Sequence, residues 1–289
     1  MIPAPSSTDA VASSPAGLRG LGRKYAHVLS MGIQNTLVYR ANFLFRAAFG
    51  LVPLTATLFL WEAIYAGRPE GTALGAYTLA QMVSYYLLVT VVDAITAVAE
   101  DDWQIAADIK DGAVSQFLLK PLDYLAYRLC LYLSGRVIYT SVALIPVAIF
   151  LFFQRGYLVG PADPWCWVLT PVSVLLAGLL QFLIAYTVAL LSFWVLDVST
   201  FIFIQFAFEY LASGHLFPLD ILPEALHRLI LWSPYPYLLY FPVGVYLGRI
   251  QGAELWRGFA LQAAWVVAAF LIARFTWARG LRKYTAVGG

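Results

Sequence analysis

The ionisable side chains within long apolar runs of the sequence include Asp93, Arg128, Arg136 and Glu209. If each run forms a helix across a membrane, the rise of about 1.5 Å per residue places Glu209 and Arg136 roughly 15–18 Å deep. The same estimate places Asp93 and Arg128 roughly 6–9 Å deep. An ionisable side chain at the centre of a bilayer costs about 2.5–3.5 kcal/mol on insertion scales. Each of these four side chains is therefore expected to have a partner or a role.

The depths suggest which side chains could meet. We expect Asp93 and Arg128 to form a structural ion pair. For Glu209 two interpretations stay open, because it could pair with Arg136 or line a pathway. The aromatic side chains that would form the wall of such a pathway beside Glu209 are Phe203, Phe206 and Tyr210. An aromatic, mostly apolar wall suits a hydrophobic or amphipathic substrate, whereas the alternative is that these rings only pack against lipid and neighbouring helices.

The sequence lacks the motifs that would make it an enzyme. It contains no Gly-x-x-x-x-Gly-Lys-Ser/Thr loop to hold nucleotide phosphates, no His-Glu-x-x-His and no Gly-x-Ser-x-Gly. His27, His215 and His227 are scattered without the spacing of metal ligands, and Cys130 and Cys166 are interpreted as packing residues. We therefore expect no catalytic residues, no metal site and no cofactor in this chain, and ATP and magnesium would have to be handled by a partner.

The composition excludes a soluble domain. Of the 289 residues, 61% are hydrophobic and 12% are charged, and the mean hydropathy is +0.76. Globular proteins carry roughly 25% charged residues, because their surfaces face water. A net charge of +2, without a basic patch, does not indicate a nucleic-acid partner. The chain is predicted to be an all-α polytopic membrane protein.

Turn signals divide the apolar sequence into elements. Residues 1–17 are predicted to be a disordered lead, and residues 18–289 a single membrane domain. Residues 18–39 have one apolar face, which predicts an amphipathic helix in the membrane interface. Six spans are expected, at about 43–66, 74–99, 124–153, 165–194, 200–217 and 255–277. The prolines between Pro218 and Pro242 predict a re-entrant hairpin between the fifth and sixth spans.

Basic residues predict the orientation of these spans. The side that bears the termini and the loop at 100–128 holds twelve lysines and arginines, whereas the other side holds five. Both termini are therefore expected to be cytoplasmic.

Residues 100–122 form the most informative polar stretch. On a helix its apolar residues form one arc: Ile105, Ala106, Ile109, Ala113 and Phe117. Its polar residues form the opposite face: Gln104, Asp108, Asp111 and Ser115. Two interpretations are possible, a docking helix for a cytoplasmic protein or a solvated loop helix.

Three motifs in this sequence resemble those of the ABC-2 type permeases, in particular the six-span family whose members often occur as two related permeases beside one ATPase. The motifs are YRANF at 39–43, IKDGAV at 109–114 running to LLKPL at 118–122, and SGHLFPLDILP at 213–223 followed by SPYP at 233–236. The resemblance extends over residues 20–283. It implies a cytoplasmic elbow helix at 18–41, a coupling helix at 100–120 docked on the ATPase, and a re-entrant element at 218–248 near the outer mouth.

The resemblance also implies function and partners. The chain would be the membrane subunit of a bacterial inner-membrane exporter, of the type V exporter kind, that dimerises with itself or a related permease and binds two copies of a cytoplasmic ATPase. The candidate contacts with the ATPase are Trp103, Ile105, Asp108, Ile109, Asp111 and Gly112. Two alternatives are a secondary transporter in which Asp93 and Glu209 relay protons, and a membrane scaffold without transport.

Overall fold

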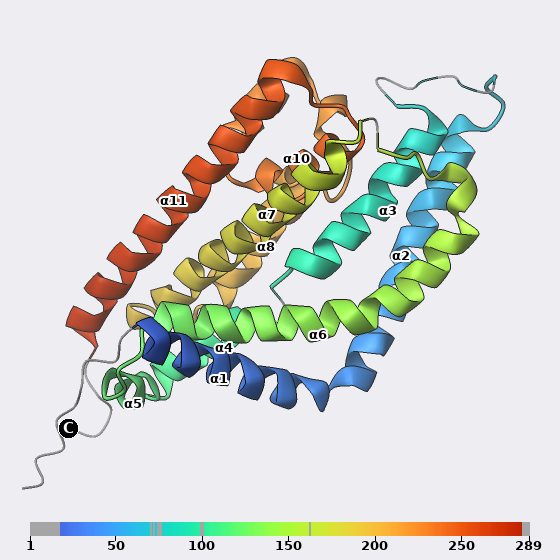
Figure 1. Ribbon diagram of the computed structural model, residues 1–289. Coiled ribbons are helices and arrows are strands. Elements are labelled where there is room, and N and C mark those ends of the chain that lie inside the picture. The colour runs from blue at the N-terminus through green and yellow to red at the C-terminus, as the bar shows by residue number, and fades with distance from the viewer. Residues whose placement is uncertain are drawn as a thin grey trace, which may run out of the picture.

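A computed structural model describes residues 18–69, 71, 73, 77–98, 101–161 and 163–284, so the lead expected at 1–17 lies outside the described residues. All the regular elements of the described part are helices, and Figure 1 shows them. The α-helices are α1 (Leu18–Leu37), α2 (Arg40–Tyr65), α3 (Leu79–Thr96), α4 (Asp101–Lys110), α5 (Val114–Leu118), α6 (Tyr124–Phe153), α7 (Cys166–Ala189), α8 (Ser199–Ala212), α9 (Glu224–Leu231), α10 (Tyr240–Tyr246) and α11 (Gly252–Lys283). Short 3₁₀ turns are η1 (Arg155–Tyr157), η2 (Leu190–Phe193), η3 (Leu219–Ile221) and η4 (Tyr235–Tyr237).

Five helical stretches are long and apolar enough to cross a membrane. They are Arg40–Tyr65, Leu79–Lys110, Tyr124–Phe153, Cys166–Phe193 and Gly252–Lys283. The prediction of a multi-pass helical membrane protein is therefore confirmed. The segment expected to be the fifth span differs, because α8 has only 14 residues and is about 21 Å long at a rise of about 1.5 Å per residue. It ends before Gly214, whose φ of 88° requires the left-handed backbone that glycine adopts readily.

The long helices pack around α7 and α6. Helix α7 contacts α3, α10 and α11, while α6 contacts α1, α2 and α3. Figure 1 shows α1, α4, α5 and the C-terminal end of α11 at one end of the bundle, and α10 with the C-terminal end of α2 and the N-terminal end of α3 at the other.

Helix α1 lies along the first half of α6 (Figure 1). The two helices approach closely at Gly32, because a Cβ atom there would lie 2.7 Å from the Ser134 Oγ. The Ser134 hydroxyl is 3.0 Å from the carbonyl of Leu29, to which it donates a hydrogen bond. The helix predicted at 18–39 is therefore present.

The segment at 100–122 is not one continuous helix. Helix α4 ends at Lys110 and α5 begins at Val114, with Gly112 between them at a φ of 78°. The expected apolar arc is only partly buried, because Ile105, Ala106 and Ile109 are buried whereas Ala113 and Phe117 are half-buried. The break at Gly112 is the physical reason, since it turns α5 away from the axis of α4.

The turn between α7 and α8 is as tight as the sequence predicts. The chain reverses between η2 and Ser199, whose backbone N–H donates to the Asp197 Oδ1 over 2.9 Å. Hydrogen bonds from Ser199 lower the pKa of the exposed Asp197 carboxyl. Helices α7 and α8 are neighbours as a result.

Short helical pieces fill the proline-rich segment after α8. Tyrosine hydroxyls on α3 satisfy its irregular backbone: Tyr85 donates to the Gly214 carbonyl over 2.6 Å and Tyr86 to the Leu216 carbonyl over 2.8 Å. The Asp220 carboxylate accepts hydrogen bonds from Tyr77, over 2.7 Å, and from Tyr240. Broken helices are tolerated at membrane depth only where protein or water satisfies their backbone groups. These bonds satisfy the carbonyl groups of Gly214 and Leu216 and the Asp220 carboxylate within the protein.

Candidate functional site

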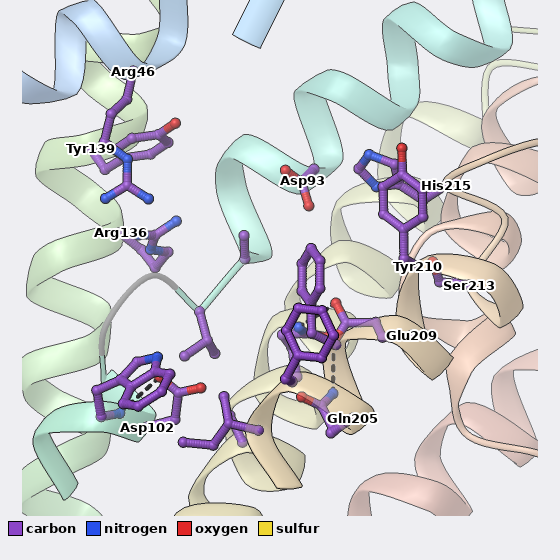
Figure 2. A pocket seen from close by; sticks show the side chains of 18 residues that line it. Arg46, Asp93, Asp102, Arg136, Tyr139, Gln205, Glu209, Tyr210, Ser213 and His215 are labelled. Carbon is purple, nitrogen blue, oxygen red and sulfur yellow. Dashed lines mark hydrogen bonds between the residues drawn. The ribbon is translucent and has the colours of Figure 1, made fainter. Parts of the chain in front are cut away.

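A cavity of about 450 Å³ lies among α2, α3, α4, α6, α7 and α8. All four residues proposed from the sequence as a pathway wall line it: Phe203, Phe206, Glu209 and Tyr210. Figure 2 shows the cavity from close by, with Arg46, Arg136 and Tyr139 on one side and Asp93, Glu209, Tyr210 and His215 on the other. Side chains that are far apart in the sequence therefore share one space.

Two side-chain amides hold the Glu209 carboxylate. The Gln181 Nε2 donates to Oε1 over 2.6 Å, and the Gln205 Nε2 donates to Oε2 over 2.7 Å. Gln205 precedes Glu209 by one helical turn on α8, and Gln181 comes from α7. The described residues place no arginine or lysine within ion-pair distance of Glu209, so the alternative that it pairs with Arg136 is wrong. The carboxylate is bound by neutral donors and faces the cavity.

Arg136 reaches the same cavity from α6 (Figure 2). The residue is 8% exposed, and its guanidinium lies 4.7 Å from the centre of the Tyr139 ring. Within the described part of the chain, its Nε has no hydrogen-bond partner. Burial without a carboxylate partner is costly for a guanidinium, so Arg136 lacks the compensation that a structural arginine usually has.

The ion pair expected between Asp93 and Arg128 is also wrong. Arg128 pairs with Asp108 of α4, and the Tyr124 hydroxyl donates to the same carboxylate over 2.7 Å. The estimate of depth placed Asp93 and Arg128 at similar levels, but α4 turns under the bundle and brings Asp108 to Arg128 instead. Asp93 lines the cavity, where its electrostatic neighbours are His215 and Arg136.

The six residues proposed as ATPase contacts do not share one face. Ile105 and Ile109 are 0% and 4% exposed, because α4 packs on α7 and η2. Asp108 is occupied by Arg128. Trp103 is half-exposed and lines the cavity.

The remaining two lie at the break between α4 and α5, where Asp111 is exposed and Gly112 makes the turn. Sequence reasoning missed the most exposed apolar residues of this region, Leu118 and Leu119, which are 52% and 89% exposed. A pair of leucines next to Lys120-Pro121 in a polar loop was the available signal.

Sequence reasoning also missed several residues of the cavity. Gln181 and Gln205 are polar residues within apolar runs, which is the signal that could have identified them. Arg46, Tyr139 and His215 could be placed in the lining only once the helices were packed. Among the described residues, no group of three or more His, Cys, Asp or Glu side chains is arranged to hold a metal ion.

Comparison with known proteins adds one match. A family model described as "ABC-2 family transporter protein" matches residues 51–288. No curated protein matches the chain. The matched residues include every element from the middle of α2 to the end of α11, and so include most of the cavity lining.

Proposed function

This chain belongs to the ABC-2 family of transporter proteins, and we propose that it is the permease of an ATP-driven exporter whose ATPase is a separate polypeptide. Family membership and the long apolar helices make the chain a multi-pass membrane subunit of a transporter. Members of this family are transport subunits, and ATP hydrolysis belongs to a partner. The observation that carries the proposal is the polar cavity enclosed by the helices of such a subunit.

We propose that the chain crosses the membrane six times, through α2, α3, α6, α7, α8 and α11. Six crossings return the chain to the side from which it started. The position of α1 and the end of α11 at the same end of the bundle supports this arrangement (Figure 1). The excess of basic residues supports a cytoplasmic location for that end. Helix α1 would then be the elbow helix, and the segment at 218–248 the re-entrant element.

The substrate is proposed to occupy the cavity beside Glu209. The wall combines aromatic side chains with a few charged groups, which is the composition of a site for an amphipathic molecule. The volume of about 450 Å³ lies within the range of about 300–1,000 Å³ that is common for ligand pockets.

Coupling to the ATPase is proposed to run through α4 and α5. One end of this segment exposes Asp111, Leu118 and Leu119, while the other end contributes Asp102 and Trp103 to the cavity wall. The pair between Asp108 and Arg128 joins α4 rigidly to α6. A push on α5 would therefore move side chains of the cavity, which is what an ATP-driven switch requires.

The working unit would contain two permeases, identical or related, and two ATPase subunits. Affinity purification of the chain from its native membrane, followed by mass spectrometry, tests this assembly. An ABC ATPase in the eluate, and ATP hydrolysis that rises when substrate is added, would support the proposal. Reconstituted vesicles that transport without ATP would refute it.

A proton-coupled secondary transporter is the second candidate, because Asp93 and Glu209 line one cavity and buried carboxylates form proton relays in such proteins. The two candidates differ in their energy source. Transport that collapses with a proton-gradient uncoupler while ATP is maintained would favour the second candidate.

A further inference from the structure

The buried guanidinium of Arg136 is the feature that the proposed function does not yet explain. Two cavities meet at this residue, the one beside Glu209 and a second of about 480 Å³ that reaches α1. Arg46 lines both of them as well. The Arg136 Nε has no hydrogen-bond partner among the described residues. This side of the cavity presents positive charge to whatever enters it.

The opposite side of the cavity presents negative charge and aromatic rings. Asp93 and Glu209 lie there, with Tyr210 and His215 beside them (Figure 2). Phe203 and Phe206 also belong to the lining. Carboxylates beside aromatic faces are a suitable site for an organic cation, because ring quadrupoles attract cations at short range.

A third carboxylate, Asp102, also belongs to the lining and lies below Arg136 in Figure 2. The Asp102 Oδ1 accepts a hydrogen bond from the backbone N–H of Trp103 over 2.9 Å. A negative charge at the first turn of α4 is also stabilised by the helix dipole. Across the cavity from Asp93 and Glu209, the Arg136 guanidinium is therefore the positive group on which the inference rests.

We propose that the substrate is a zwitterionic amphiphile, whose anionic group binds Arg136 and whose cationic group lies between Asp93 and Glu209. The inference rests on the proposed function and deepens it by naming the class of substrate. A purely cationic substrate would displace water from the cavity and give the Arg136 guanidinium no anionic group to bind. A purely anionic substrate would give Asp93 and Glu209 no cationic group to bind. Only a zwitterion places an opposite charge next to both Arg136 and the two carboxylates, so it should bind more tightly than a singly charged substrate.

The test uses three probes that share an octyl chain and differ in the headgroup: octylphosphocholine, octyltrimethylammonium and octyl phosphate. Each is titrated, below its micellar concentration, onto the full-length permease in phosphatidylglycerol nanodiscs, and binding is measured by calorimetry. We expect octylphosphocholine to bind about tenfold or more tightly than either singly charged probe. Equal affinity for the zwitterion and for one singly charged probe would overturn the proposal.

Variants assign the two sides of the cavity. Arg136→Gln should weaken the zwitterion about tenfold and leave the affinity for the cation unchanged, whereas Glu209→Gln should weaken the zwitterion and spare the anion. Arg155→Gln is a matched control for the first, because Arg155 lies 4.7 Å from the Phe152 ring on an exposed turn. Glu224, whose side chain is 81% exposed, provides the control Glu224→Gln for the second. Arg136→Gln with unchanged selectivity would overturn the proposal.

If Arg136→Gln does not fold, a second variant tests the role of the positive charge. Arg136→Lys keeps the charge and should keep the preference for the zwitterion over the cation. Loss of that preference in a variant with an unchanged melting temperature would overturn the role of the charge.

The lipid composition of the nanodisc shows whether the ligand is a bilayer lipid or a soluble molecule. Replacing phosphatidylglycerol by phosphatidylcholine distinguishes sources of the same chemistry, because a bilayer lipid that occupies the site would lower the affinity for octylphosphocholine, whereas a soluble substrate would not.

ATPase assays distinguish a failure of the proposed function from a failure of the proposed substrate class. Charge-selective binding without any associated ATPase would refute the proposed function alone. ATPase activity stimulated equally by the cation and the zwitterion would support the proposed function and refute the substrate class.

Discussion

Glu209 is half-buried and Arg136 is buried, and the two side chains have different partners. Glu209 accepts two hydrogen bonds from glutamine amides, which offset part of the cost of taking its carboxylate out of water. The Arg136 guanidinium lies beside the Tyr139 ring, with Asp93 as an electrostatic neighbour, and its Nε has no hydrogen-bond partner among the described residues. The glutamine amides hold the Glu209 carboxylate in position, whereas the Arg136 Nε is left to bind an acceptor from a ligand.

Neutralising Glu209 should therefore leave the fold intact. In Glu209→Gln the amide loses at most one of two hydrogen bonds, at a cost of about 1 kcal/mol, and a flip of the Gln205 amide restores it. We expect a melting temperature close to that of the wild type and a loss of substrate-stimulated ATPase activity. Thermal unfolding and ATPase assays on the purified complex measure both quantities. An active and stable variant would remove Glu209 from the pathway.

The double variant tests whether the two residues form a pair. Because the structure places no ion pair between them, the stability changes of Glu209→Gln and Arg136→Gln should add within about 0.5 kcal/mol. Rescue of one variant by the other, measured in the same unfolding assay, would restore the ion-pair interpretation.

Asp108 and Asp111 lie three residues apart and should behave differently. Asp108→Asn removes the partner of the buried Arg128 guanidinium and should destabilise the protein by about 3 kcal/mol. Asp111→Asn changes an exposed side chain and should be neutral within about 0.5 kcal/mol. Chemical denaturation of both variants checks this difference, which would disappear if Asp108 faced water.

At the residue scale, sequence reasoning identified groups but not their partners. Phe203, Phe206 and Tyr210 were grouped with Glu209 because they share one helix, and one helix fixes their relative positions. The partner of Arg128 was not predictable in this way. Depth along a helix gives one coordinate, whereas an ion pair also depends on rotation about the axis and on the path of α4, which only the packed structure provides.

At the scale of elements, apolar runs predicted the long helices well. The run at 124–153 matches α6 at both ends, and the run at 165–194 corresponds to α7 and η2. Helix boundaries set by backbone conformation were harder to predict. The break at Gly112 and the early end of α8 before Gly214 depend on positive φ angles, and hydropathy does not report these.

The tip formed by α5 and the residues after it should be the part of the chain that binds the ATPase. Leu118 at the end of α5 and Leu119 after it are exposed, so a partner that covered them would bury apolar surface. In Asp111→Lys combined with Leu119→Glu, a reversed charge and a new charge on this tip should reduce co-purification of the ATPase about tenfold or more. Fluorescence-detected size-exclusion chromatography should show that the permease itself remains folded.

A leucine elsewhere at the same end of the bundle provides the control. Leu196 is 88% exposed in the turn between α7 and α8, so Leu196→Glu makes an equal change outside the tip. Retention of the ATPase in this variant and its loss in the double variant would assign docking to the tip. Equal loss in both would contradict that assignment.

For the molecule as a whole, the number of crossings depends on α8 and the segment that follows it. Five stretches satisfy the length and hydropathy of a span, and α8 alone is too short at about 21 Å for a hydrocarbon core about 30 Å thick. The segment after α8 makes up the difference in our proposal, because tyrosines of α3 satisfy its backbone at depth. The sequence signalled this region through its prolines but could not show which groups compensate for the broken helices.

The crossing number decides where the C-terminus lies, which makes it measurable. Starting from a cytoplasmic N-terminus, six crossings return Gly288 to the cytoplasm, whereas five would place it outside. We expect single cysteines at Asp9, Asp111 and Gly288 to resist a membrane-impermeant maleimide added to intact cells, and cysteines at Gly67 and Gly160 to react. The background would carry Cys130→Ala and Cys166→Ala, so that only the introduced thiols report. Permeabilised cells provide the control, because every accessible position should then react. Labelling of Gly288 but not of Asp9 in intact cells would mean five crossings. In that case α8 and the segment after it would fold back to the cytoplasmic side, and the cavity beside Glu209 would open only inward.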